Sequence, residues 1–152
     1  PRPERVASEM IRVCKPGGMI VMGNWTPEGH VGQMFKVIGK HVPPPSYFPS
    51  PLLWGDEATC RERFSKGVSG MKITRYQYPF RYPFPPAKVV DFFIEYYGPT
   101  NKAYAALDGG GRAALHDELT ALWTRNNTAT DGSTTVLAIL RATGGNPSPS
   151  TL

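Results

Sequence analysis

A helix, a Pro-Gly-Gly turn and an apolar strand follow one another near the start of the chain, and this succession restricts the possible folds more than any other segment. Four apolar residues recur at helical spacing and predict one apolar helix face: Ala7, Met10, Ile11 and Cys14. Pro16 ends such a helix because it has no N–H to donate. Gly17 and Gly18 permit the positive φ angles of a tight turn. Met19–Trp25 is then apolar on both faces, which is typical of a strand in a sheet covered by helices on both sides.

The later apolar patterns predict an alternation of helices and strands. Helices are expected at 29–42, Glu57–Ser65, Pro86–Tyr96 and Leu115–Asn126, and strands at Met71–Tyr78 and Ser133–Thr143. Asp56 is expected to cap the second of these helices. Prolines at 43–51 and 79–86 break the chain, and Gly109–Gly111 is interpreted as a linker between helices.

This alternation predicts an α/β fold with a three-stranded mixed sheet and flanking helices. A crossover connection should set the first two strands parallel. We expect one domain over residues 1–143, followed by a polar Pro/Ser tail at 144–152 that is predicted to be disordered.

Composition excludes several functional classes. The formal net charge is +5, but the lysines and arginines are scattered singly, so no basic stripe for a nucleic acid is predicted. No apolar run is long enough to span a membrane. Two cysteines, Cys14 and Cys60, are too few for a disulfide scaffold and indicate reduced core residues of a cytoplasmic protein. The three histidines and two cysteines lack metal-ligand spacing, so no metal site is expected.

One stretch of sequence resembles a known enzyme family. Glu9-Met10-Ile11-Arg12-Val13-Cys14-Lys15-Pro16-Gly17-Gly18, followed by Met19-Ile20-Val21-Met22, is similar to the helix–turn–strand just past the middle of class I S-adenosylmethionine-dependent methyltransferases. The resemblance implies that this chain is the C-terminal half of a Rossmann-like fold, in which the last strand inserts antiparallel between the two before it. It also implies an S-adenosylmethionine site in an intact parent, mostly upstream of Pro1. No strand-GxGxG-helix is present here, so no cofactor-binding residue is assigned.

The residues after the strand resemble one branch of that family, the small-molecule methyltransferases annotated near ubiquinone and menaquinone biosynthesis. The matching segments are Asn24-Trp25-Thr26-Pro27-Glu28-Gly29, Gly32-Gln33-Met34-Phe35, Pro43-Pro44-Pro45 and Pro51-Leu52-Leu53-Trp54-Gly55. In an open α/β sheet, ligands bind beyond the carboxyl ends of the strands. The candidate substrate-binding residues are therefore Asn24, Trp25, Thr26, Glu28, Tyr47, Phe48 and Trp54.

The aromatic members of this set suit a methyl-transfer pocket. Trp25, Tyr47, Phe48 and Trp54 could form a wall that favours a cationic donor and an apolar acceptor, with the Pro-rich loop as a lid. Packing of these rings onto the core is the alternative interpretation.

A hydroxyl acceptor can require a general base, for which Glu28, His30 and His41 are the candidates by type. A solvated surface position is nevertheless expected for His30. His41 and His116 are also expected at the surface, so no catalytic residue is assigned.

Three functions remain open from the sequence. The favoured hypothesis is part of an enzyme that methylates a small molecule and is inactive as this chain alone. The alternatives are a non-catalytic binding or structural module completed by a partner chain, and a stand-alone α/β domain whose Lys-Pro-Gly-Gly match is accidental. In the intact methyltransferase fold, strand 19–25 would pair with an upstream strand. In this chain alone its edge is expected to be open, which predicts self-association.

Overall fold

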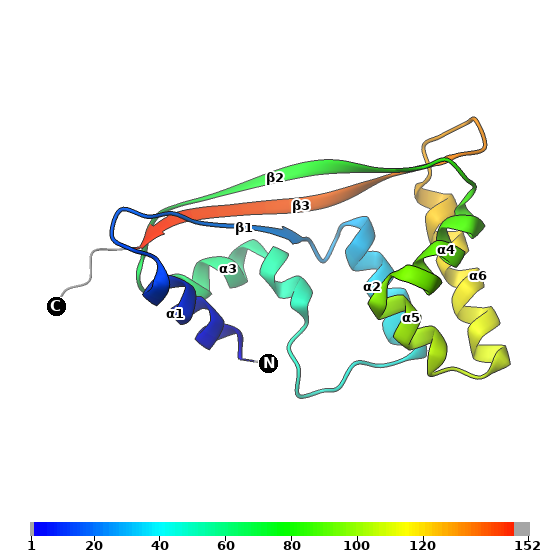
Figure 1. Ribbon diagram of the computed structural model, residues 1–152, viewed down its shortest axis with the longest axis horizontal. Coiled ribbons are helices and arrows are strands. Elements are labelled where there is room, and N and C mark those ends of the chain that lie inside the picture. The colour runs from blue at the N-terminus through cyan, green and yellow to red at the C-terminus, as the bar shows by residue number, and fades with distance from the viewer. Residues whose placement is uncertain (1, 148–152) are drawn as a thin grey trace. The chain divides into compact units, whose positions relative to one another are not determined.

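The computed structural model describes residues 2–147 (Figure 1). Its elements are α1 (Pro3–Val13), β1 (Ile20–Trp25), α2 (His30–His41), the 3-10 helix η1 (Pro51–Gly55), α3 (Glu57–Arg63), β2 (Val68–Tyr82), α4 (Pro86–Tyr96), α5 (Gly98–Ala105), α6 (Gly109–Asn126) and β3 (Thr134–Pro147). The chain forms two compact units. Within the described residues, the first unit holds 2–27, 46–77 and 139–147, and the second holds 28–45 and 78–138.

The three strands are ordered β1-β3-β2. β1 pairs antiparallel with β3, with Ile20 opposite Gly145 and Trp25 opposite Leu140. β2 also runs antiparallel to β3, because Ser69 near its beginning bonds to Asn146 while Thr134 bonds to Phe84 just past its end. The α/β class is confirmed, but the sheet is antiparallel rather than mixed. β1 and β2 run the same way, as expected, yet β3 separates them.

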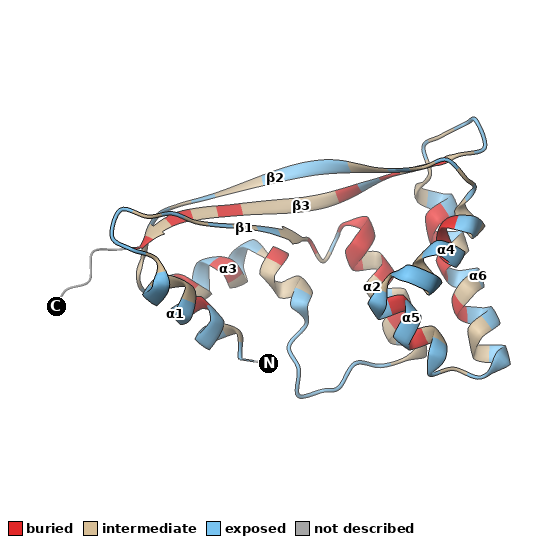
Figure 2. Ribbon diagram, in the orientation of Figure 1, coloured by how far each residue is buried: buried red, intermediate tan, exposed pale blue. Residues whose placement is uncertain are grey.

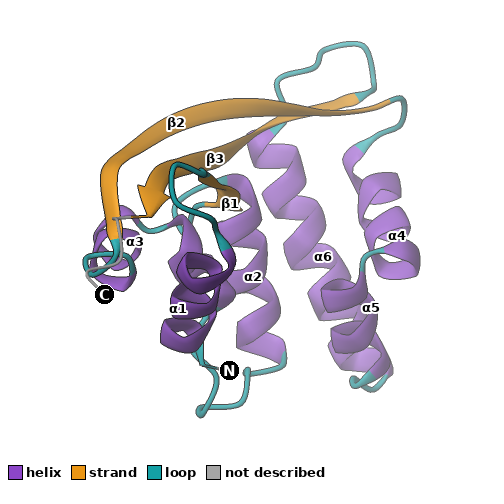
Figure 3. Cartoon of the chain, turned by 60° about the vertical axis from the view of Figure 1, so that its left-hand side comes forward, coloured by secondary structure: helices purple, strands orange, loops and turns teal. Residues whose placement is uncertain are grey.

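In the first unit, helices α1 and α3 lie on one side of the sheet (Figures 1 and 3). Ile20 and Met22 are half-buried, whereas Met19 and Val21 are 66% and 67% exposed, because successive side chains of a strand point to opposite faces. No residue of β1 is fully buried, as the colours of this strand show (Figure 2). The prediction that this strand is buried on both faces is therefore wrong for its outer face.

The second unit has a helical core. The buried apolar side chains come mainly from α2, α4 and α6: Val31, Met34, Ile38, Val89, Val90, Leu115, Leu119, Leu122 and Trp123. The ring of Trp123 stacks edge-on against Phe93 and Tyr82, with ring centroids 5.1 and 5.8 Å away. The apolar face predicted for residues 29–42 is confirmed, since Val31, Met34 and Ile38 are all buried.

Several predicted boundaries differ from the structure. β2 continues through Pro79 to Tyr82, because an edge strand can leave one backbone N–H position unpaired. Gly109–Gly111 is the first turn of α6 rather than a linker, since the Asp108 carboxylate accepts from the Gly111 N–H at 2.7 Å. β3 extends to Pro147, so 144–147 belong to a strand. The rest of the predicted tail, 148–152, lies outside the described residues.

The predicted cap at Asp56 is confirmed and gives a first test. Its carboxylate accepts from the backbone N–H and the hydroxyl of Thr59, at 2.9 and 2.7 Å, and these bonds lower the pKa of Asp56. Asp56→Ala is expected to lower the free energy of unfolding by about 1 kcal/mol, as for other helix caps. Urea denaturation at neutral pH would measure this, and an unchanged midpoint would contradict it. Asp56→Asn, which keeps an acceptor oxygen, is the matched control.

Candidate functional site

The end of β1 brings together the first three predicted site residues. Thr26 is completely buried, and its backbone N–H donates to the carbonyl of Ile139 at 3.0 Å, which extends the β1–β3 ladder by one residue. Asn24 and Trp25 are half-buried at the end of the strand. The local sequence explains why β1 ends here, because Pro27 has no backbone N–H to donate to the neighbouring strand.

Gly55, at the end of η1, packs directly on the backbone at this point. A Cβ built on Gly55 would clash with the Trp25 carbonyl oxygen and would lie 2.6 Å from its carbonyl carbon. Only a residue without a side chain allows so close an approach. The Arg141 guanidinium, on β3 opposite Asn24, donates to the Gly55 carbonyl at 2.9 Å. In the sequence, Gly55 is notable only as the last residue of the Pro51–Gly55 segment that resembles the family, and nothing in the local pattern signals this packing.

Asn24 carries a buried polar atom that lacks a hydrogen-bond partner among the described residues. This atom, its Nδ2, is inaccessible to solvent. A buried donor without an acceptor costs about 1–3 kcal/mol. Native proteins therefore pair most such atoms with water or a bound molecule. Asn24 is the one predicted site residue that carries such an atom among the described residues.

The predicted aromatic site residues after β1 differ in exposure and in packing. Tyr47 and Phe48 stack on one another, with ring centroids 4.4 Å apart, and Tyr47 is 75% exposed. The ring of Trp54 lies under the Arg63 guanidinium, 4.3 Å from its centroid, and 6.2 Å from the ring of Phe64. Trp54 therefore packs against Arg63, the last residue of α3, and against Phe64, which follows it. Such packing onto the core is the alternative interpretation given for these rings.

Glu28 belongs to the second unit, whereas the other six predicted site residues belong to the first. Its side chain is exposed, and its backbone carbonyl accepts a hydrogen bond from the Gln33 side chain at 3.2 Å. This bond closes the first turn of α2.

His30 was expected at the surface, but it is only 3% exposed. It lies at the beginning of α2, where its ring packs edge-on against Trp123 of α6 with a centroid distance of 4.3 Å. Burial, together with the positive charge of Arg125, lowers the pKa of His30 to about 4. The sequence could not reveal this, because the covering residues come from α6, more than 90 positions later.

A chain of hydrogen bonds fixes which nitrogen of His30 holds the proton. The Glu28 carbonyl can only accept, so Gln33 turns its amide nitrogen toward it and its Oε1 toward Asn126. The Asn126 Nδ2 then donates to Nδ1 of His30 at 3.1 Å. The neutral ring must carry its proton on Nε2, which is buried without a partner among the described residues. His30 is thus a neutral N–H donor at pH 7.

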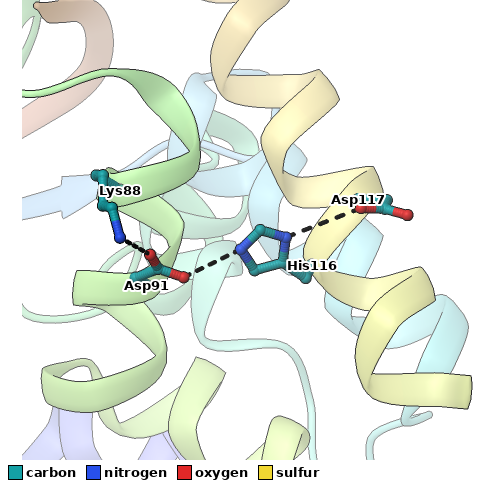
Figure 4. A network of polar contacts seen from close by, with 4 residues as sticks. All are labelled: Lys88, Asp91, His116 and Asp117. Atoms are coloured by element: carbon teal, nitrogen blue, oxygen red, sulfur yellow. Dashed lines mark hydrogen bonds and ion pairs between the residues drawn. The ribbon is translucent and has the colours of Figure 1, made fainter. Parts of the chain in front are cut away.

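The other two histidines lie beside carboxylates in the second unit. Nε2 of His116 lies 3.1 Å from Asp91, which also pairs with Lys88 at 3.2 Å (Figure 4). Partial burial raises the pKa of Asp91, but the hydrogen bonds from Lys88 and His116 outweigh it and lower the value. Nε2 of His41 lies 3.3 Å from Glu118, and its side chain is only 14% exposed. Such partly exposed pairs on helices are ordinary features and indicate no catalysis.

The remaining features of the first unit do not indicate a reactive centre. Burial raises the pKa of the Cys60 thiol, and its Sγ donates to the Trp54 carbonyl at 2.9 Å, as a structural cysteine does. Within residues 2–147, no group of histidine, cysteine and carboxylate side chains is placed to hold a metal ion. No helix among them has the length and apolar character needed to cross a membrane.

Comparison with known proteins finds mycobacterial relatives. Uncharacterized protein Rv1405c of Mycobacterium tuberculosis is 39% identical over 121 residues, which cover 78% of this chain and 43% of the relative. Uncharacterized protein Rv1403c of the same organism is 34% identical over 125 residues, which cover 80% of this chain and 46% of the relative. Uncharacterized protein Mb1440c of Mycobacterium bovis matches to the same extent as the first. The chain therefore spans less than half the length of these relatives. No protein-family profile matches it.

Proposed function

We propose that this chain is the distal part of a class I S-adenosylmethionine-dependent methyltransferase that acts on a small molecule. The observation that carries the proposal is the strand order β1-β3-β2, with β3 antiparallel to β1 and inserted between β1 and β2. The resemblance at Glu9–Met22, which rests on the sequence alone, implies this insertion of the last strand. The greater length of the relatives supports the view that further residues complete the fold.

The proposed acceptor site lies at the carboxyl end of β1. Asn24 would bind the acceptor molecule through its buried Nδ2, which suits an oxygen or an unprotonated nitrogen. Trp25 would supply an apolar surface that excludes water. Thr26 and Gly55 would hold these two residues in place, because the Thr26 N–H bonds to β3 and Gly55 packs on the Trp25 backbone.

The cofactor, when bound, supplies an activated methyl group, so the protein's main task is to align donor and acceptor. β1 ends at Asn24-Trp25 and is followed by Thr26-Pro27 and not by a glycine-rich turn, so we assign no residue of this chain to the cofactor. His30 is not proposed as a base, since its Nδ1 is occupied by Asn126 and its Nε2 holds a proton. We further propose a cytoplasmic protein without a nucleic-acid or membrane partner.

The proposal is tested in a chimera in which this chain replaces the matching segment of the 39% identical mycobacterial relative. Calorimetry with S-adenosylhomocysteine is expected to show binding by both the relative and the chimera. Transfer of labelled methyl from S-adenosylmethionine to a panel of small phenols and quinols would then identify an acceptor. If neither protein binds S-adenosylhomocysteine, the methyltransferase assignment is wrong, and a non-catalytic α/β module becomes the leading interpretation.

Within the active chimera, Asn24→Ala tests the acceptor site. We expect the KM for the acceptor to rise about tenfold, the equivalent of one hydrogen bond, with S-adenosylhomocysteine affinity unchanged. Asn101→Ala is the matched control, because the Asn101 amide already donates to the Ile94 carbonyl at 2.9 Å in the other unit. Equal effects of Asn24→Ala and Asn101→Ala on the KM would show that Asn24 does not bind the acceptor.

A further inference from the structure

We propose that Arg141 is a positioning residue, which clamps η1 onto the acceptor end of β1 and so fixes the shape of the acceptor site. Its guanidinium joins two segments that lie 86 positions apart in the sequence, since Nη1 donates to the Gly55 carbonyl at 2.9 Å. The role at the acceptor site rests on the proposed function, whereas the clamp itself is a contact that can be measured without any cofactor.

The register of the sheet places Arg141 beside the acceptor site. Arg141 of β3 lies directly opposite Asn24 of β1. Residues directly opposite one another in an antiparallel pair project to the same face, with their Cβ atoms about 4.5–5.5 Å apart. The Arg141 side chain therefore leaves the sheet next to Asn24 and on the same face, and it reaches η1 from there.

Two successive carbonyls of η1 are held by side chains from other elements. Arg141 holds the Gly55 carbonyl with a bond from an ionised donor, which is stronger than a bond between neutral groups. The Cys60 thiol of α3 donates to the Trp54 carbonyl at 2.9 Å. These bonds keep the Gly55 backbone where a Cβ would clash with the Trp25 carbonyl oxygen. Arg141 thus acts on the end of β1 through Gly55.

Arg112 offers a comparison within the same chain, because it makes the same kind of bond away from the candidate site. Its Nε donates to the Tyr104 carbonyl at 3.0 Å, and its guanidinium carbon lies over the Tyr104 ring, 5.4 Å from the centroid. This contact joins α5 to α6 in the second unit. Arg112 therefore represents an arginine–carbonyl bond with a structural role alone.

Acceptor kinetics in the active chimera test the role of Arg141 at the site. Arg141→Gln is expected to raise the KM for the acceptor about tenfold and to change kcat less than about twofold, as for a loss of uniform binding. Arg141→Lys keeps a positively charged donor, so its KM should return to within about threefold of the wild-type value. Arg112→Gln should lower the Tm but leave the KM unchanged.

A double-mutant cycle on the 152-residue chain tests the clamp without the cofactor. Arg141→Gln is expected to raise the equilibrium constant of unfolding about tenfold in the wild type. In the Gly55→Ala chain, where η1 has already moved away from β1, the same substitution should raise it less than about twofold. Arg112→Gln, which shares no partner with Gly55, should have the same effect in both backgrounds.

The outcomes separate a failure of this inference from a failure of the proposed function. If Arg141→Gln has equal effects on unfolding with and without Gly55→Ala, Arg141 does not clamp η1, whatever the enzyme does. If the chimera binds S-adenosylhomocysteine and Arg141→Gln leaves the acceptor KM unchanged, the role at the site is overturned. If the relative and the chimera bind no S-adenosylhomocysteine, the methyltransferase assignment and the acceptor role fall together, and the cycle alone decides the clamp.

Discussion

Gly55→Ala is expected to destabilise the first unit by about 3 kcal/mol, the upper part of the range for overpacking. The added methyl would lie 2.6 Å from the Trp25 carbonyl carbon and 2.9 Å from the Thr26 Cα. Both atoms belong to a backbone held in the β1–β3 ladder, so neither can move as a flexible side chain would. η1 must therefore shift away from β1, which also removes the Arg141 hydrogen bond to the Gly55 carbonyl.

Urea denaturation followed by far-UV circular dichroism would measure this loss. Gly23→Ala in β1 is the matched control, because its Cβ meets Leu140 at 3.6 Å and alanine reduces the flexibility of the unfolded chain. We expect Gly23→Ala to be neutral or stabilising by up to about 1 kcal/mol. A Gly55→Ala protein as stable as the wild type would mean that η1 does not pack on β1 in solution.

The second large effect is a loss of stability between pH 6.5 and pH 4 caused by His30. Its pKa falls from the ordinary value of 6.5 to about 4 in the folded protein. The folded state therefore prefers the neutral ring, and the contribution of His30 to the free energy of unfolding is fully present above pH 6.5. As the pH falls through this window, the unfolded chain takes up a proton that the folded chain does not. The free energy of unfolding should decrease by about 3 kcal/mol, or about 1.4 kcal/mol per pH unit.

His30→Phe isolates this contribution. The phenyl ring keeps the contact with Trp123 but does not titrate, so the slope of stability against pH between 6.5 and 4.5 should disappear. Carboxylates such as Asp56 and Glu118, whose pKa values are lowered, lose their contributions at still lower pH. Equal slopes for wild type and His30→Phe would show that His30 is solvated.

Local patterns predicted the elements that depend on neighbouring residues. The spacing of apolar residues located α1 and α2, Pro16 and Gly17 marked the turn that follows α1, and Asp56 predicted a cap. Gly17 adopts the positive φ expected of it, at 73°. These features were predictable because helix periodicity, capping and turn chemistry act over only a few residues.

Features that depend on distant residues were not predictable. Pro79 reads as a strand breaker, yet β2 tolerates it as an edge strand, and edge position is set by the whole sheet. His30 and Gly55 have no distinctive local pattern, because their environments are made by α6 and by the end of β1. In the candidate site, the predicted strand was enough to place Asn24, Trp25 and Thr26 at its carboxyl end. The exposure of the Tyr47–Phe48 pair and the packing of Trp54 against α3 could not be predicted from the local sequence.

Among the elements of residues 2–147, the central strand of the sheet comes last in the sequence. β3 ends at Pro147, and both β1 and β2 depend on it for their neighbouring backbone hydrogen bonds. During translation, β1 and β2 therefore leave the ribosome before β3, the strand beside which both lie. Such long-range pairing slows folding and exposes unpaired strands to aggregation. Chaperones that hold extended apolar segments would accordingly act on this protein before residue 134 is made, and not afterwards.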